Sequence, residues 1–293
     1  MAFNLVTFKT RAVTAIVFVV IMLAGLLWNH WVFFILFSVI HFGCWLEYHK
    51  LVGLIEPEYQ KITLFHKYGI MVAGWAFMLF MAGNAYSTGR ISLHTIGAFL
   101  LLISGIILPL MLVVLNKHFS VKVILLTIAG LLYISVSWGL MMHIRSVGLI
   151  AKGFTALYDK GWIIPMILIA SIWINDTMAY IVGSFFGKTP FSSISPKKTW
   201  EGVAGGAILC VAVVSLAGRY LFHIEIIHLA VISIIAAVIG TLGDLLESKL
   251  KRTAGVKDSG ELMPGHGGFL DRFDSLILAT PFVWLYVVLL MTR

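Results

Sequence analysis

Charged residues are scarce in this sequence, and their scarcity argues against a soluble protein. Asp, Glu, Lys and Arg make up 12% of the 293 residues, whereas a soluble domain carries about 25%. Cysteine is also rare: Cys44 and Cys210 are the two present, and both lie inside apolar runs. Two such thiols exclude a disulfide framework and a cysteine-based zinc site. The sequence also lacks a P-loop, a Ser-His-Asp order and a candidate cysteine nucleophile.

Long apolar runs take the place of charge, since 60% of the residues are hydrophobic. A membrane span needs about 20 predominantly apolar residues. Nine apolar segments can be drawn, at about 13–28, 31–46, 68–86, 94–115, 122–143, 162–183, 202–222, 227–246 and 275–292. The first shows no small-residue cleavage site, so we expect a retained helix. The predicted fold class is all-α: a polytopic integral membrane helical bundle of about nine transmembrane helices.

The segments contain no internal repeat, low-complexity tract or linker to a soluble domain. We therefore expect one transmembrane catalytic domain over residues 1–293. Its N-terminal spans would cover about 1–143, and its motif-bearing spans and loops about 162–293. Asn29-His30 predicts a tight hairpin between the first two spans.

Lys and Arg concentrate in cytoplasmic loops of membrane proteins, so their distribution bears on orientation. With a cytoplasmic N-terminus, 15 of the 21 lie on that side and 6 on the other. Eight of the 15 belong to two candidate functional loops, and without them the count is 7 against 6. A cytosolic substrate for those loops would favour the cytoplasmic (inner) membrane with the active site facing the cytosol. The net charge of +8 fits anionic lipid better than nucleic acid.

The two candidate loops, 184–201 and 247–274, hold most of the polar residues that could react. Asp244 and Glu247 are three residues apart where a helix is expected to end, so they share a face. Asp271 and Asp274 repeat this spacing where the next helix is expected to begin. Two carboxylate pairs thus flank a glycine-rich basic loop. Hard oxygen ligands of this kind suit Mg²⁺, which binds through one or two carboxylates plus substrate phosphates.

The loop between the carboxylate pairs carries groups suited to phosphate. Glycines let backbone N–H groups approach an anion closely, and cationic side chains neutralise its charge. The candidates are Lys251, Arg252, Lys257, His266, Gly267, Gly268 and Arg272. For any one of them a solvated positive-inside loop is the ordinary alternative, but the whole set together favours a phosphate site.

Residues 195–202 of the other loop read Ser-Pro-Lys-Lys-Thr-Trp-Glu-Gly. They predict a helix with Ser195 as its N-cap and Pro196 as its first residue. Lys197 and Lys198 would lie on the first turn, where the positive end of the helix favours phosphate. The alternative is a capped helix with ordinary flanking lysines.

Asp176 lies inside a predicted span, about seven residues from its cytoplasmic end and so roughly 10 Å deep. Inserting a carboxylate there costs about 2.5–3.5 kcal/mol, so it must face a polar cavity or a partner. A hydrogen bond to Tyr180 is the structural alternative. Glu47, at the end of the second span, is expected to be interfacial, with a position facing the same cavity as the alternative.

These residues resemble the signature of a known family, the phosphatidate cytidylyltransferases or CDP-diacylglycerol synthases. The 27 residues 248–274 match as Ser-x-Leu-Lys-Arg-x4-Lys-Asp-x-Gly, continuing to His-Gly-Gly-x2-Asp-Arg-x-Asp. Residues 195–202 resemble a second stretch of that family, and residues 175–180 (Asn-Asp-x2-Ala-Tyr) a third. Met263 departs from the more usual Leu, Ile or Phe by a volume-conserving change. The N-terminal half resembles the family in its hydropathy.

The resemblance implies that CTP and phosphatidate react to give CDP-diacylglycerol and pyrophosphate, with Mg²⁺ and room for a second cation, K⁺ or Mg²⁺. Asp244 and Asp271 are then predicted to hold the metal, with Asp274 and Asp176 completing the catalytic set. Substrate binding falls to the seven loop residues named above together with Ser195, Lys197 and Lys198. Membrane lipids are expected partners, a homodimer is an admissible assembly, and nucleic acid is not expected.

Two other functions remain open from the sequence. A CTP-dependent lipid kinase acting on a polyprenol or similar alcohol would use comparable phosphate chemistry. An ion-coupled transporter would also explain a carboxylate within a span, but its site would lie near the bilayer midplane, often in repeated halves. Here the charge gathers at one surface and no repeat is seen.

Overall fold

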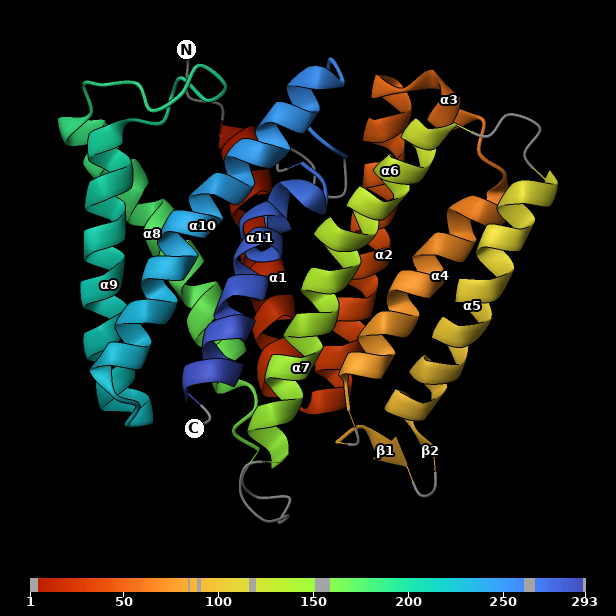
Figure 1. Ribbon diagram of the computed structural model, residues 1–293. Coiled ribbons are helices and arrows are strands. Elements are labelled where there is room, and N and C mark those ends of the chain that lie inside the picture. The colour runs from red at the N-terminus through yellow and green to blue at the C-terminus, as the bar shows by residue number, and fades with distance from the viewer. Residues whose placement is uncertain are drawn as a thin grey trace. The chain divides into compact units, whose positions relative to one another are not determined.

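A computed structural model describes residues 5–83, 85–88, 91–115, 120–150, 159–260 and 267–291. Within these residues helices dominate (Figure 1), and eight of them are long and apolar enough to cross a membrane. A shorter apolar stretch, Ala12–Leu27, precedes the eight. The chain is therefore a polytopic helical membrane protein, as predicted. Each of the nine predicted segments overlaps a helix, although 68–86 extends past the end of its helix at Met81, and the described apolar part of the first is short.

The chain divides into two compact units, Met1–Met142 with Thr253–Arg272, and His143–Arg252 with Phe273–Arg293. The first unit contains α1 (Leu5–Leu27), α2 (His30–Ile55), α3 (Pro57–Gln60), α4 (Leu64–Met81), the strands β1 (Ser87–Thr88) and β2 (Ile91–Ser92), α5 (Leu93–Leu115), α6 (Val121–Gly130) and the π-helix η1 (Leu131–Val136). The second contains α8 (Ile163–Phe186), α9 (Trp200–Phe222), most of α10 (Ile226–Thr253) and η2 (Val287–Met291). The helices α7 (Ser137–Ile150) and α11 (Leu270–Tyr286) contribute residues to both units.

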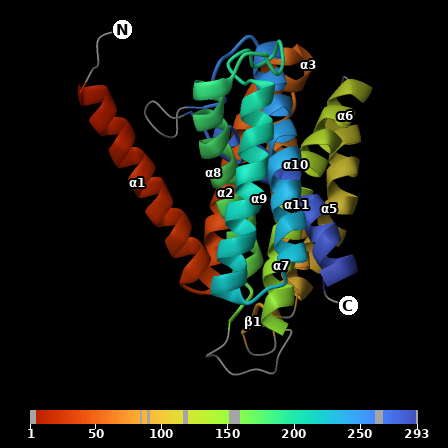
Figure 2. The same ribbon diagram turned by 90° about the vertical axis from the view of Figure 1, so that its left-hand side faces the viewer.

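In the first unit the predicted hairpin between the first two spans is confirmed. Asn29 is extended and its side chain accepts a hydrogen bond from Val32 N at 2.9 Å, so it caps α2. Figure 2 shows α1 meeting α2 at this junction and diverging from it. Further along α2, Trp45 Nε1 donates to Ser135 Oγ of η1 at 2.9 Å. This buried bond fixes α2 against the π-helix.

In the second unit α8 and α9 pack along much of their length (Figure 1). Small residues allow this close approach: a Cβ on Gly202 would lie 2.8 Å from the carbonyl oxygen of Ala179, and one on Gly206 would lie 2.7 Å from Ala179 Cβ. Close packing of small residues is a common basis of helix association in membranes. It sets the position of the loop that joins the two helices.

Helix ends differ from the predictions around both candidate loops. The helix α10 continues to Thr253, so Lys251 and Arg252 lie on a helix and not in a loop. Asp244 therefore lies within α10 and not at its end, because the apolar pattern that marked the end stops before the helical hydrogen bonding does. Similarly α8 continues to Phe186, which places Asp176 ten residues from its end, roughly 15 Å along the axis.

Candidate functional site

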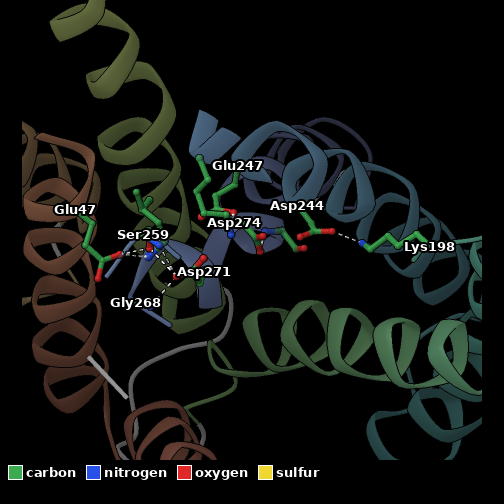
Figure 3. A network of polar contacts seen from close by, with 11 residues as sticks. Glu47, Lys198, Asp244, Glu247, Ser259, Gly268, Asp271 and Asp274 are labelled. Atoms are coloured by element: carbon green, nitrogen blue, oxygen red, sulfur yellow. Dashed lines mark hydrogen bonds and ion pairs between the residues drawn. The ribbon is translucent and has the colours of Figure 1, made fainter. Parts of the chain in front are cut away.

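The second unit brings together a group of acidic and basic side chains, here called the Asp244 cluster: Asp244, Glu247, Asp274, Lys198 and Lys251. Asp244 forms an ion pair with Lys198 (Figure 3), and the two side chains are 28% and 31% exposed. Asp274 lies beside Asp244 and Glu247. The sequence predicted Asp244, Asp274 and Lys198 for one site, and the structure places these three together.

A close approach of two helices produces this proximity. A Cβ on Gly243 of α10 would lie 2.6 Å from the carbonyl oxygen of Asp274 on α11. No side chain fits into that distance, so a glycine is required where the two backbones meet. Asp244, the next residue of α10, is thereby held against the first turns of α11.

Glu247 and Lys251 form a second ion pair within α10. Glu247 is fully buried, and Lys251 Nζ lies 2.5 Å from its Oε2. The spacing of four residues, with the acid nearer the N-terminus, is the favourable order on a helix. A buried carboxylate is tolerated when a partner compensates its charge. Lys251 thus carries this structural role, and its predicted contact with phosphate stays a prediction.

The loop between α8 and α9 is held by its own hydrogen bonds. The carboxylate of Glu201 accepts from Lys188 N at 3.1 Å, from Thr189 N at 3.2 Å and from Thr189 Oγ1 at 2.9 Å. Thr199 forms an isolated antiparallel bridge with Pro190. These bonds close the loop into a compact turn that presents Lys198 to Asp244.

The predicted N-cap at Ser195 is wrong. The helix begins at Trp200, and Thr199 is the cap, because its Oγ1 accepts from Gly202 N at 3.2 Å. Ser195 instead opens a turn in which its carbonyl oxygen accepts from Lys198 N at 3.1 Å. Proline at the second position favours such a turn as strongly as a helix start, so Lys197 and Lys198 lie before the helix and not on its first turn.

Asp176 is directed toward the same cluster. Lys198 and Asp244 act on it electrostatically, and Asn175 Nδ2 donates to its Oδ1 at 3.5 Å. The alternative partner, Tyr180, is 77% exposed. A carboxylate within a membrane span requires a polar cavity or a partner, and Lys198 is a cationic partner for Asp176.

The first unit holds a separate polar group, here called the Glu47 cluster: Glu47, Ser259, Gly268 and Asp271 (Figure 3). Glu47 Oε1 accepts from Phe269 N at 2.7 Å, and Oε2 accepts from Leu270 N at 2.9 Å. These are the N–H groups at the start of α11. A carboxylate from α2 therefore caps α11 and interacts favourably with its positive end.

Asp271 completes this cluster. Its Oδ2 accepts from Ser259 N at 2.9 Å and from Gly268 N at 2.7 Å. The Ser259 hydroxyl lies 2.6 Å from Glu47 Oε2 and 2.9 Å from Asp271 Oδ2, so its single proton bonds one carboxylate at a time. Oδ2 of Asp271 therefore links Ser259 and Gly268, two residues of the connection between α10 and α11.

Two glycines of the signature make room for Glu47. A Cβ on Gly268 would lie 2.1 Å from Glu47 Oε1, and one on Gly260 would lie 2.3 Å from the same atom. Gly267 has a φ of 80°, a conformation that glycine adopts without strain. The backbone N–H of Gly268, predicted to approach an anion, approaches the anionic side chain of Asp271.

The remaining predicted residues occupy more open positions. Lys197, Arg252, Lys257 and Arg272 are exposed, and Ser195 is half-buried. His266 lies outside the described residues. Their assignments to substrate stay predictions.

The predicted site residues included neither Glu47, which was expected to be interfacial, nor Ser259. The available signal for Glu47 was its charge: α2 continues to Ile55, so Glu47 lies well inside a helix that is long enough to span. An ionisable residue in such a helix points by default to a functional site. Ser259 lies at a position of the family signature that any residue can occupy, so no pattern pointed to it.

The residues of the Asp244 cluster suit a hard divalent cation. Three carboxyl groups face two lysines, and carboxylate oxygens are the ligands that Mg²⁺ prefers. Within the described residues, no three Asp, Glu, His or Cys side chains form a ready cage. Mg²⁺ does not require one, since it usually keeps several waters and takes its remaining ligands from substrate phosphates.

The sequence of the whole chain identifies its class. The model of the Cytidylyltransferase family matches residues 9–290, and the chain belongs to this family. The match includes both units and all the described residues of the two clusters.

Individual relatives agree with this assignment. The chain is 44% identical over 136 residues to the phosphatidate cytidylyltransferase of Synechocystis, covering 46% of each protein. It is 44% identical over 120 residues to the Bacillus subtilis phosphatidate cytidylyltransferase, covering 40% of this chain and 45% of that one. It is 41% identical over 139 residues to the chloroplastic phosphatidate cytidylyltransferase 4 of Arabidopsis thaliana, covering 47% and 36%. The chain thus spans about half or less of the curated relatives it matches.

Proposed function

We propose that this protein transfers the cytidylyl group of CTP to phosphatidate, releasing pyrophosphate and leaving CDP-diacylglycerol in the membrane. Membership of the Cytidylyltransferase family and the names of the similar proteins support this reaction. The observation that carries it is the Asp244 cluster, in which carboxylates on membrane-spanning helices meet the partly exposed Lys198 of the loop before α9. A lysine neutralises phosphate charge, and carboxylates can hold a cation that binds the phosphates of both substrates.

The chemistry needs positioning more than proton transfer. An oxygen of the phosphatidate phosphate attacks the α-phosphorus of CTP while the bond to the pyrophosphate oxygen breaks. The attacking phosphate is already ionised, so no general base is required. Charge grows on the departing pyrophosphate, and cationic groups that are already in place lower the barrier most. Lys198, held by the turn at Ser195, is the first candidate for this task.

The same proposal includes Mg²⁺, with Asp244 and Asp274 as the residues that would hold it in the second unit. When bound, the ion would neutralise and orient the phosphates. Asp244 is partly exposed and can reach a ligand, whereas Asp274 is buried beside it. Asp271 stays a predicted ligand, and the second cation stays a prediction as well.

We place the reaction at the cytosolic face of the cytoplasmic membrane, because CTP is a water-soluble nucleotide and phosphatidate is a bilayer lipid. The loop 187–199 and the signature loop carry cationic residues of the kind that cytoplasmic loops accumulate. The homodimer stays a prediction, which mass photometry of the purified protein tests.

The decisive experiment supplies purified protein in phosphatidate-containing micelles with Mg²⁺ and CTP labelled at the α-phosphorus. We expect the label to enter the lipid phase and unlabelled pyrophosphate to appear. A parallel reaction with γ-labelled CTP and a polyprenol distinguishes the lipid kinase, which would move the γ-label to lipid. Absence of α-label in the lipid, where a known phosphatidate cytidylyltransferase works, would refute the proposal.

A Mg²⁺ titration tests the role of Asp244. We expect Asp244→Asn to require at least about tenfold more Mg²⁺ for half-maximal rate, since one anionic ligand is lost. Glu225→Gln is the matched control, because Glu225 is a 74% exposed carboxylate at the opposite end of α10. An unchanged Mg²⁺ requirement in Asp244→Asn would exclude Asp244 as a ligand.

A further inference from the structure

A cavity of about 560 Å³ lies within the first unit, between α4, α5 and the continuous helix formed by α6 and η1. Its walls are almost wholly apolar. They include Ile70 and Phe77 of α4, Leu101 and Leu108 of α5, Ile124 of α6 and Leu131 of η1. None of these residues belongs to the Asp244 cluster or the Glu47 cluster.

The cavity exists because α4 and α5 touch at two levels and separate between them. A Cβ on Gly97 would lie 2.3 Å from Phe80 N, and one on Gly69 would lie 2.4 Å from Leu108 Cδ2. Gly105 lies between these levels, and a Cβ there would have no neighbour within 4 Å. The open space in front of Gly105 is part of the cavity.

The cavity adjoins the lipid side of the unit. In the described part of the chain, α5 packs extensively against α4 but not against α6 or η1, which themselves pack on α4 or on each other. The opposite face of α5 is exposed and apolar, with Phe99 at 61%, Leu102 at 62% and Ile106 at 62%. This face lies in hydrocarbon when α5 spans the bilayer, so an acyl chain can enter beside α5.

Four polar side chains line this largely apolar space, those of His66, Ser104, Thr127 and Ser135, and His66 is the largest of them. His66, on the first turn of α4, lines the cavity and is 6% exposed. Neither of its ring nitrogens has a hydrogen-bond partner. A buried polar group without a partner costs about 1–3 kcal/mol. A ligand that offers His66 a hydrogen bond at this end, and a long apolar chain along the rest, would complete the site.

The dimensions decide which kind of occupant fits. His66 and Phe77 are eleven residues apart on α4, which is roughly 16 Å. A volume of about 560 Å³ over this length gives a mean cross-section of roughly 35 Å². A space of this length and width accommodates a hydrocarbon chain, which its apolar walls favour.

We propose that this cavity binds one acyl chain of a membrane glycerophospholipid, with an ester oxygen of that lipid accepting a hydrogen bond from His66. The site lies on α4, α5, α6 and η1 and is independent of the proposed cytidylyl transfer. Bound lipid fills the space between α4 and α5 and satisfies the buried imidazole.

Photolabelling tests the proposal without any measurement of turnover. The full chain is reconstituted in phosphatidylethanolamine and phosphatidylglycerol vesicles, with some phosphatidylglycerol carrying a diazirine midway along one acyl chain. After irradiation, adducts are mapped by mass spectrometry. We expect adducts on the cavity-facing residues Ile70, Leu101 and Leu108 as well as on the outer face of α5.

Gly105→Phe would fill the cavity, and Gly105→Ala is its matched control. We expect Gly105→Phe to lower labelling of the cavity-facing residues about tenfold, equivalent to about 1.4 kcal/mol, and to leave outer-face labelling as in Gly105→Ala. Unchanged outer-face labelling also shows that the variant is inserted and folded. Equal cavity labelling in the two variants would overturn the proposal.

A second variant tests the polar contact. His66→Leu keeps the cavity apolar and of similar size but removes the hydrogen-bond donor. We expect phospholipid that remains bound through detergent washing to fall about fivefold, the effect of one neutral hydrogen bond. Undiminished lipid retention in His66→Leu would show that His66 does not hold the ligand.

Discussion

At the scale of single residues, Glu47 connects two parts of the first unit that are more than 200 positions apart in sequence. Its two oxygens accept hydrogen bonds from Phe269 N, Leu270 N and the Ser259 hydroxyl. Glutamine could supply one carbonyl oxygen for these donors but would turn an NH₂ group toward the others. The negative charge near the start of α11 would also be lost.

We expect Glu47→Gln to destabilise the protein, because hydrogen bonds to a charged group contribute about 1.5–3 kcal/mol. The apparent melting temperature of the variant should fall. Turnover should fall as well, even when it is measured well below the melting temperature of the variant, since the residues between α10 and α11 lose their hydrogen bonds to Glu47. Glu58→Gln is the control, because Glu58 is an exposed carboxylate of α3 in the same unit. Wild-type melting and turnover in Glu47→Gln would contradict the capping role.

Lys198 gives a second prediction at this scale. Lys198→Met should lower kcat/KM for CTP by about ten- to a hundredfold. This loss is somewhat smaller than that caused by removing a fully enclosed hydrogen-bond donor to the transition state, because Lys198 is 31% exposed. Lys197→Met is the matched control: it removes the same charge from the neighbouring, exposed position of the turn. Similar losses in both variants would show that general positive charge, and not the pairing with Asp244, is what matters.

At the scale of helices, glycine spacing decides which faces can meet. On α10, Gly243 lies against the backbone of Asp274, whereas the nearest atom to a Cβ on Gly240 would be Ser275 Cβ at an ordinary 3.4 Å. The two glycines are one turn apart on the same helix and contact the same neighbour, α11. Their difference in available space makes them a matched pair.

We expect Gly243→Ala to separate α10 from α11, lowering the melting temperature and the rate together, because a backbone atom cannot move aside as a side chain can. Gly240→Ala should be neutral or slightly stabilising, since alanine favours helix by about 0.8–1 kcal/mol over glycine. Thermal melting and cytidylyl transfer are measured on both. A Gly243→Ala protein as stable and active as Gly240→Ala would refute the close approach.

At the scale of the whole molecule, the spans predict which loops share a side of the membrane. Helix α9 has 23 residues and is roughly 35 Å long, enough to cross a hydrocarbon core of about 30 Å. The loop before it and the connection after it must therefore lie on opposite sides. The native thiols of Cys44 and Cys210 are fully buried, so an introduced cysteine can be labelled over a low background.

We expect a membrane-impermeant maleimide to label Glu225→Cys in intact cells and to leave Ser193→Cys unlabelled until the membrane is opened. Both positions are exposed and flank α9. The reverse pattern in inside-out vesicles would confirm the comparison. Labelling of Ser193→Cys in intact cells would contradict a cytosolic site.

Much of this protein follows from sequence alone because the bilayer imposes strong rules. A helix must satisfy its own backbone hydrogen bonds in hydrocarbon, so each predicted apolar run became a helix. The family signature is equally local: its residues lie within 27 consecutive positions. Asp274 lies in this signature, Lys198 in the second stretch at 195–202, and Asp244 was predicted from its spacing to Glu247.

Tertiary structure decided the features that depend on contacts between distant segments. Helix α10 extends past its apolar run, and α9 begins at Trp200 with Thr199 as its cap, although the residues also allowed a start at Ser195. Glu47 caps α11 because α2 lies beside the start of that helix. Gly243 is a contact point because the backbone of α11 lies against it. Composition and spacing determine which segments enter the membrane, whereas packing determines which polar groups then meet, since that choice depends on atoms far apart in the chain.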